Sequence, residues 1–124
     1  MRQDYQKDFF ELGNKLRDLG YDEVRETELL AEFRLKSGWK LLFKCERYYG
    51  PAFALVIVPP EGLGRAQGYA VWLLMLAFEE LQDESYGNPT IDAQINFLIR
   101  NRDQIFNSTS YYEDQYFRLN DVPT

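Results

Sequence analysis

The sequence contains no histidine and only one cysteine, Cys45. The usual zinc ligands and the commonest general base are therefore missing, and a catalytic serine or cysteine would have no imidazole beside it. A single cysteine also excludes an internal disulfide, which fits a reducing cytoplasm. We expect Cys45 to be a buried, unreactive thiol on the apolar face of a strand. No carboxylate spacing matches a calcium loop, and we predict no metal, no cofactor and no enzymatic activity.

Long apolar stretches are missing as well. The longest, residues 69–78, is about half of the roughly 20 residues that a membrane helix needs. The N-terminal residues are polar and lack the apolar core of a signal peptide. We therefore expect a cytoplasmic protein that makes no membrane contact. With 124 residues and a hydrophobic content of 45%, the chain is expected to form one globular domain over residues 1–124.

Negative charge is confined to one half of the chain. Residues 1–60 contain ten acidic and ten basic side chains, whereas residues 61–124 contain ten acidic and four basic ones. The whole net charge of −6 therefore belongs to the second half. Such a surplus repels phosphate and attracts basic surfaces, so a basic protein is the favoured partner and nucleic acid is not.

The order of the predicted elements indicates an α+β fold. Residues 4–19 have apolar side chains at every third or fourth position, which predicts an amphipathic helix. Three predicted strands follow at residues 30–35, 39–45 and 53–58. The first two alternate, and the third is apolar throughout, as in a strand covered on both faces. We expect the N-terminal helix to pack on a three-stranded antiparallel meander, followed by two or three C-terminal helices.

The apolar pattern also fixes the loop between the first two strands. A two-residue loop would place Leu35 opposite Lys40, whereas the three-residue loop 36–38 places Leu35 opposite Trp39. Residues opposite each other share a face, so only the longer loop gathers the apolar side chains on one face. We predict this loop, with Gly38 in the left-handed conformation.

Two or three helices are expected in the second half. The first, residues 65–81, is apolar nearly all round, so it is covered either by other elements of the chain or by a second chain. We expect intramolecular covering and a monomer. Thr90 is the predicted N-cap of a helix over residues 91–106. Residues 111–119 form either a short last helix, from the capping-box spacing of Ser110 and Glu113, or a strand.

Residues 62–68 read Gly-Leu-Gly-Arg-Ala-Gln-Gly and stand between a predicted strand and a predicted helix, as a nucleotide-binding glycine loop does. The glycine spacing differs from that pattern, and no second parallel strand follows. We interpret the segment as a turn.

The apolar helix ends in four carboxylates: Glu79, Glu80, Asp83 and Glu84. They form two like-charge pairs four residues apart, and they lie at the negative end of the helix dipole. Residues that oppose local stability in this way are candidates for a binding surface. The alternative is a solvated helix end, neutralised by bases such as Lys40 or Lys44.

The C-terminal segment adds further acidic and aromatic side chains: Tyr111, Tyr112, Glu113, Asp114 and Tyr116. Tyrosine is a frequent interface anchor, because its ring supplies contact area and its hydroxyl a hydrogen bond. These side chains either extend the acidic binding surface or close one side of the core.

The chain resembles the small acidic immunity proteins of bacterial toxin–immunity systems, including polymorphic and contact-dependent toxins. The resemblance rests on size, the acidic second half, the α+β order and one segment, Asn88-Pro89-Thr90-Ile91-Asp92, which leads into residues 97–106. It implies stoichiometric binding that neutralises a basic toxin domain, such as a nuclease, by blocking its active site or substrate groove. The resemblance assigns no individual binding residue.

The alternative is a secretion-chaperone-like module that binds an effector protein. Such chaperones are similar in size and acidity, and they also begin with a helix and three strands. They usually dimerise through a helix and have two further strands before the last helix. Here the predicted helix at residues 91–106 occupies that part of the sequence.

Overall fold

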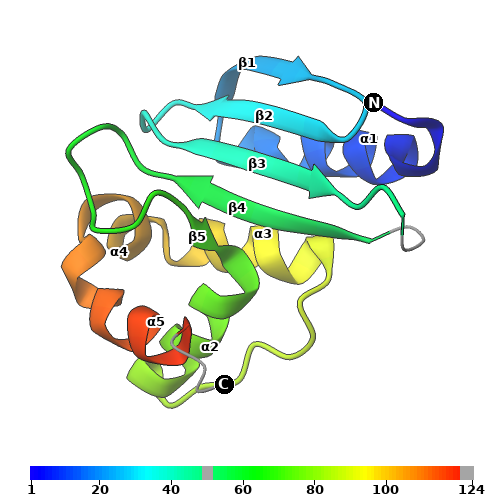
Figure 1. The fold of residues 1–124 in the computed structure, drawn as a ribbon. Coiled ribbons are helices and arrows are strands. Elements are labelled where there is room, and N and C mark those ends of the chain that lie inside the picture. Colours follow the sequence, from blue (N-terminus) through cyan, green and yellow to red (C-terminus); the bar gives the residue numbers. More distant parts are fainter. Residues whose placement is uncertain (49–51, 121–124) are drawn as a thin grey trace.

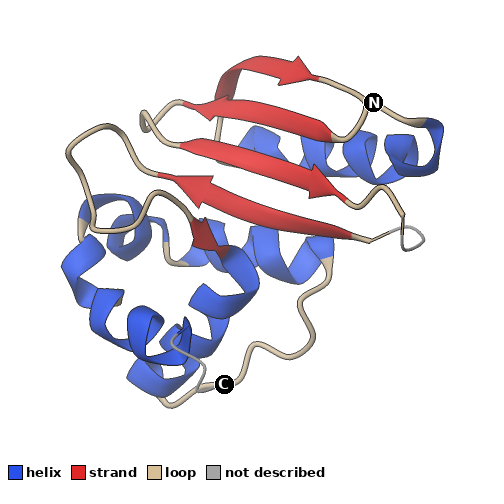
Figure 2. Ribbon diagram, viewed as in Figure 1, coloured by secondary structure: helices blue, strands red, loops and turns tan. Residues whose placement is uncertain are grey.

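The computed structural model describes residues 1–48 and 52–120. The strands are β1 (Tyr21–Glu26), β2 (Leu30–Leu35), β3 (Lys40–Cys45), β4 (Phe53–Val58) and β5 (Tyr69–Ala70). The α-helices are α1 (Gln6–Lys15), α2 (Val71–Gln82), α3 (Ile91–Arg100), α4 (Arg102–Asn107) and α5 (Glu113–Asn120). Figure 1 shows one sheet with α1 and α3 behind it and the other helices gathered beyond β5. Strands and helices are segregated, as Figure 2 shows, which confirms the α+β class.

The sheet has five antiparallel strands in sequence order, β1-β2-β3-β4-β5. The predicted three-stranded meander corresponds to β2, β3 and β4, so the predicted number of strands is wrong. β1 was missed because it has only Tyr21 and Val24 as apolar residues beside four charged ones. β5 has two residues, which is too short to produce a periodic pattern.

The predicted hairpin between β2 and β3 is confirmed. The Leu35 N–H donates to the carbonyl of Trp39 at 2.8 Å, and Phe33 pairs with Leu41. Gly38 has a φ of 89°, the left-handed conformation that the three-residue loop requires. This register places Ala31, Phe33, Leu41 and Phe43 on the inner face of the sheet, where they are buried and where α1 lies. Leu30 and Leu42 share the outer face with Lys44 and Glu32.

None of the described helices lies over the outer face of the sheet (Figure 1). On β4, Leu55 and Ile57 point inward and are fully buried, whereas Ala54 and Val56 point outward and are half-buried. The prediction that this strand is covered on both faces therefore holds fully for the inner face and only in part for the outer face. Part of the cover comes from the loop 59–68, since a Cβ on Gly68 would lie 2.9 Å from the side chain of Val56.

The N-terminal helix packs on the inner face as predicted. Leu12 and Leu16 are fully buried, and the Phe9 ring lies 5.8 Å from the ring of Phe33 on β2. The helix is shorter than the predicted 4–19, because 3-10 turns form at Gln3–Tyr5 and Leu16–Asp18. Gly20, with a φ of 78°, ends this segment.

The apolar helix α2 begins at Val71 rather than at residue 65, because residues 59–68 form a loop and β5 follows directly. α2 packs against α5, α3 and β4, so its covering is intramolecular on these sides. The cover is incomplete: Trp72 is 45% exposed and Leu76 is 43% exposed. Within the described residues, no helix is long and apolar enough to cross a membrane.

The helix predicted over residues 91–106 is divided at Asn101 into α3 and α4. Thr90 caps α3 as predicted, since its hydroxyl accepts the Ala93 N–H at 3.1 Å. The last segment is a helix, α5, rather than a strand. It begins two residues later than predicted, after a 3-10 turn at Thr109–Tyr111.

Candidate functional site

The acidic cluster lies at the C-terminal end of α2. The helix ends at Asp83, whose backbone is left-handed with a φ of 53° and whose N–H donates to the Glu79 carbonyl. Asp83 is exposed, and the Glu79 carboxylate accepts the Tyr86 N–H at 3.4 Å. Asp83 is therefore open to solvent and Glu79 is half-buried, and both lie beside the unfavourable end of the helix dipole.

Arginines of the second half neutralise the other two acids. Glu84 pairs with Arg100 of α3 at 2.6 Å, and Glu80 pairs with Arg118 of α5. The predicted alternative named Lys40 and Lys44 for this role, which is wrong, because Lys40 lies on the outer face of the sheet and pairs with Glu32. Only Glu79 and Asp83 of the four have no ion-pair partner within the described part of the chain.

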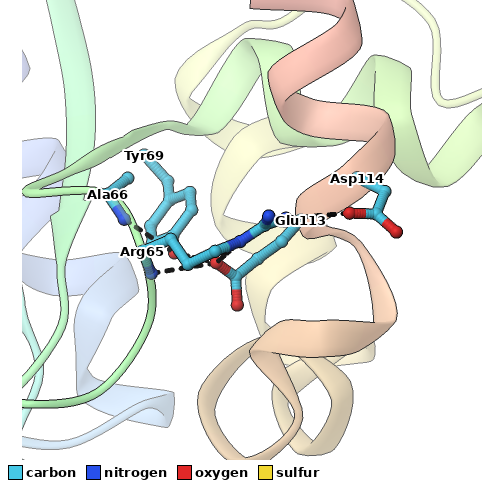
Figure 3. Close-up of polar contacts among 5 residues, drawn as sticks. All are labelled: Arg65, Ala66, Tyr69, Glu113 and Asp114. Carbon is cyan, nitrogen blue, oxygen red and sulfur yellow. Dashed lines mark hydrogen bonds and ion pairs between the residues drawn. The ribbon is translucent and has the colours of Figure 1, made fainter.

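Glu113 is not part of an exposed surface. It opens α5 and is only 5% exposed, and its Oε2 accepts three hydrogen bonds (Figure 3). The donors are the Arg65 N–H at 2.9 Å, the Arg65 Nε at 3.1 Å and the Tyr69 hydroxyl at 3.3 Å. Asp114 is exposed and binds the other end of the same guanidinium at 2.9 Å. Together these bonds fasten the loop 59–68 to α5.

The environment of Glu113 keeps it ionised. Burial by itself raises the pKa of this carboxyl, but hydrogen bonds from the Thr109 hydroxyl, from Arg65 and from Tyr69 outweigh burial, and the net pKa lies below its usual value. Thr109, Arg65 and Tyr69 all donate hydrogen bonds to this carboxylate. Glu113 therefore acts as a structural anion rather than as an acid that releases a proton near neutral pH.

The tyrosines of the C-terminal segment divide between core and surface. Tyr112 is fully buried and its hydroxyl donates to the Ile105 carbonyl at 2.7 Å, so that burial raises the pKa of Tyr112. Tyr116 is also buried, and its hydroxyl accepts the Ala70 N–H at 2.9 Å. Tyr111 is partly exposed, with its ring 5.5 Å from that of Phe78. Tyr112, Glu113 and Tyr116 thus close the core, and of the five predicted residues in this segment Tyr111 and Asp114 are the two that a partner can reach.

An exposed apolar pair on α2 was missed in the sequence. Trp72 and Leu76 lie one turn apart, and Glu79 and Asp83 continue the same stripe toward the C-terminal end of the helix. We call these four residues the α2 face. A shallow groove runs beside it, lined by Trp72, Met75, Leu76, Glu79, Gly87 and Pro89. The four-residue spacing is visible in the sequence, but the uniform apolarity of α2 hides which side faces water.

The remaining sequence candidates have structural roles. The glycine segment 62–68 lies in a loop that leads into a strand antiparallel to β4, so the strand–loop–helix context of a nucleotide site is absent. Cys45 is half-buried, and burial raises the pKa of its thiol to about 11, which keeps it protonated at neutral pH. Within the residues that the structure covers, no three His, Cys, Asp or Glu side chains are grouped to hold a metal ion.

Comparison with known proteins identifies no relative. No protein-family model matches the chain, and neither curated proteins nor solved structures give a significant match. The geometry of the chain is therefore the basis for any assignment of function.

Proposed function

We propose that this protein binds a basic protein partner through the α2 face and neutralises it stoichiometrically, as an immunity protein neutralises a toxin domain such as a nuclease. The observation that carries the proposal is the exposed pair Trp72 and Leu76, next to the unpaired carboxylates Glu79 and Asp83. The α2 face is smaller than the binding surface expected from the sequence, because Tyr112, Glu113 and Tyr116 of that expected surface are buried.

The layout of the α2 face matches the anatomy of protein interfaces. Interfaces have an apolar centre with a polar rim, and tryptophan is among the residues that contribute most when buried there. Trp72 and Leu76 form such a centre, and the groove past Met75 gives a partner side chain a place to enter. The apolar pair supplies the area that must be removed from water.

The rim of the α2 face selects the charge of the partner. Glu79 and Asp83 carry uncompensated negative charge, and they belong to the half of the chain that holds the entire net charge of −6. The Glu80–Arg118 and Glu84–Arg100 pairs are exposed, and exposed ion pairs contribute little to stability. A basic partner can therefore replace these arginines at low cost, which adds two further carboxylates to its binding site.

The test is a comparative capture followed by reconstitution. The tagged wild-type protein is used as bait in a lysate of its native host beside the variant Trp72→Ala/Leu76→Ala. Tyr48→Ala is the matched control, because Tyr48 is 82% exposed and lies outside the α2 face. We expect the wild type and the control to retain the same basic protein, and the double variant to lose it.

The captured protein is then purified and titrated by calorimetry. A stoichiometry of one partner per chain, with inhibition of the partner's own activity, supports the proposal. Equal capture by the double variant, or a partner whose activity is unaffected when saturated, overturns it. Retention of a secreted effector that stays active favours the chaperone-like alternative.

A further inference from the structure

The free edge of the sheet is a second surface that the proposed function does not use. β1 is the first strand in the sheet order and pairs only with β2 among the described strands, and Figure 1 shows it as the outermost strand. The Thr27 N–H donates to the Leu30 carbonyl, and Glu26 pairs with Ala31 and Val24 with Phe33. Since inward and outward peptide groups alternate along an antiparallel strand, the N–H and C=O of Val24 point toward the free edge.

Exposed apolar side chains lie beside this edge. Phe10 of α1 is 65% exposed and Val24 is 43% exposed. Between them runs a groove formed by α1, β1 and β2, with Phe9, Tyr21 and Phe33 among its lining residues. Large exposed apolar side chains next to unpaired backbone groups are the features on which an added strand packs.

The charges of β1 identify the added strand. Four of the six residues of β1 are charged, which normally discourages pairing between edges. Glu23 and Arg25 pair with each other within one chain at 2.8 Å on the outer face of the sheet. When two copies of β1 run antiparallel with Val24 opposite Val24, Glu23 of each copy also faces Arg25 of the other, so the same charges can pair between the copies. Asp22 lies at an irregularity of β1 between Tyr21 and Glu23, so the regular part of the pairing is centred on Glu23, Val24 and Arg25.

We propose that the protein forms a symmetric dimer in which β1 pairs antiparallel with β1 of a second copy, about a two-fold axis at Val24. The two five-stranded sheets become one continuous sheet. Both copies of α1 lie on the same face of it, and the two Phe10 rings flank the paired Val24 side chains. β1 forms one edge of the sheet, and α2 follows β5 at the opposite edge. The dimer therefore leaves both α2 faces open to partners.

Cysteine cross-linking tests the predicted register. The variant Val24→Cys is made in a Cys45→Ser background, and Trp72→Cys in the same background is the matched control, because Trp72 is 45% exposed. Under mild oxidation we expect the Val24→Cys variant to form a covalent dimer at least about ten times faster than the control, since paired residues across a two-fold axis lie within disulfide distance. Equal rates overturn the proposal. Faster cross-linking of the control overturns it too and places the interface on α2 instead.

Sedimentation of the free wild-type protein tests the dimer itself. We expect the mass to rise with concentration from 14.7 kDa to twice that value. Arg25→Glu should raise the dissociation constant about tenfold. Lys44→Glu is an equal charge change at an exposed side chain of β3, away from the β1 edge, and should leave the dissociation constant unchanged. A monomeric mass up to about 1 mM overturns the proposal. Because neither variant touches α2, loss of the dimer with intact partner capture separates this inference from the proposed function.

Discussion

The Glu113 carboxylate positions Arg65 of the loop 59–68 and Tyr69 of β5. Removing this carboxylate should therefore lower the free energy of unfolding. Glu113→Ala leaves the Arg65 N–H and the Tyr69 hydroxyl without their acceptor, and unsatisfied buried groups of this kind cost about 2–3 kcal/mol in total. Asp114→Ala is the control, because Asp114 binds the same arginine but is exposed. We expect urea denaturation to show a large loss for the first variant and a small one for the second. Equal losses would contradict the structural role of Glu113.

The same carboxylate predicts how stability depends on pH. Its pKa is lowered in the folded protein, so the stabilisation is fully present above the unfolded value near 4.5 and is lost as pH falls through the folded value. The difference in the free energy of unfolding between wild type and Glu113→Gln should therefore be constant from pH 7 to about 5 and should shrink below about 4. Denaturation of both proteins across this range measures the difference. A gap that widens on acidification would reverse the assigned direction of the shift.

Two glycines in the loop 59–68 differ in the space around them. Gly62 and Gly64 both have positive φ, so alanine strains the backbone at either position by roughly 1 kcal/mol. A Cβ on Gly64 would also lie 2.7 Å from the Tyr69 hydroxyl, whereas a Cβ on Gly62 meets nothing within 4 Å. We predict that Gly64→Ala lowers the free energy of unfolding by at least twice as much as Gly62→Ala, as thermal denaturation of the two variants can show.

Among the secondary-structure elements, α2 has an end that opposes its own stability. Asp83 is the only non-glycine residue with positive φ in the described part of the chain, and its carboxylate faces the negative end of the helix dipole. Asp83→Gly removes both costs, so we expect it to stabilise the free protein by about 0.5–1 kcal/mol. Asp83→Ala keeps the backbone strain and should gain less. A loss of stability in the glycine variant would mean that the Asp83 side chain makes a favourable contact.

The accuracy of the sequence analysis follows the strength of each local pattern. The β2–β3 register was predictable because a one-residue slip would bury lysines, and the N-cap at Thr90 because its hydroxyl has a specific acceptor role. β1 was not predictable, since an edge strand with one solvated face has few apolar residues to alternate.

Tertiary contacts account for the division of the long helix at Asn101. The Asn101 side chain is buried and bonds the Phe97 carbonyl, the Gln82 amide and the Tyr86 hydroxyl. Two of the three partners, Gln82 and Tyr86, come from α2 and the segment after it, 19 and 15 residues away from Asn101. A short window of local sequence around Asn101 therefore lacks most of the contacts that end α3. The same holds for Tyr112 and Tyr116, whose burial depends on Tyr69 from another part of the chain.

At the scale of the whole molecule, charge and apolar surface are distributed differently from what the sequence suggests. The second half of the chain does contain six more acidic than basic residues. Three of its four arginines, however, form ion pairs with acidic residues of the same half, namely Arg65, Arg100 and Arg118. The candidate site is therefore smaller than the predicted nine residues. Its apolar centre was not predictable, because only the packing of α5, α3 and β4 around α2 determines which side of the helix remains open.

This separation of charge from apolar contact predicts two different kinetic defects. Glu79→Lys/Asp83→Lys removes unpaired rim charge, so association with the basic partner should slow at least about tenfold and lose most of its salt dependence. Trp72→Ala/Leu76→Ala removes the apolar centre, so dissociation should accelerate while the association rate changes little. Surface plasmon resonance with the purified partner measures the association and dissociation rate constants. Measurements at 50 and 300 mM salt compare two Debye lengths that differ by roughly a factor of two. If both variants change only dissociation, the carboxylates contribute through direct contact and do not steer the encounter.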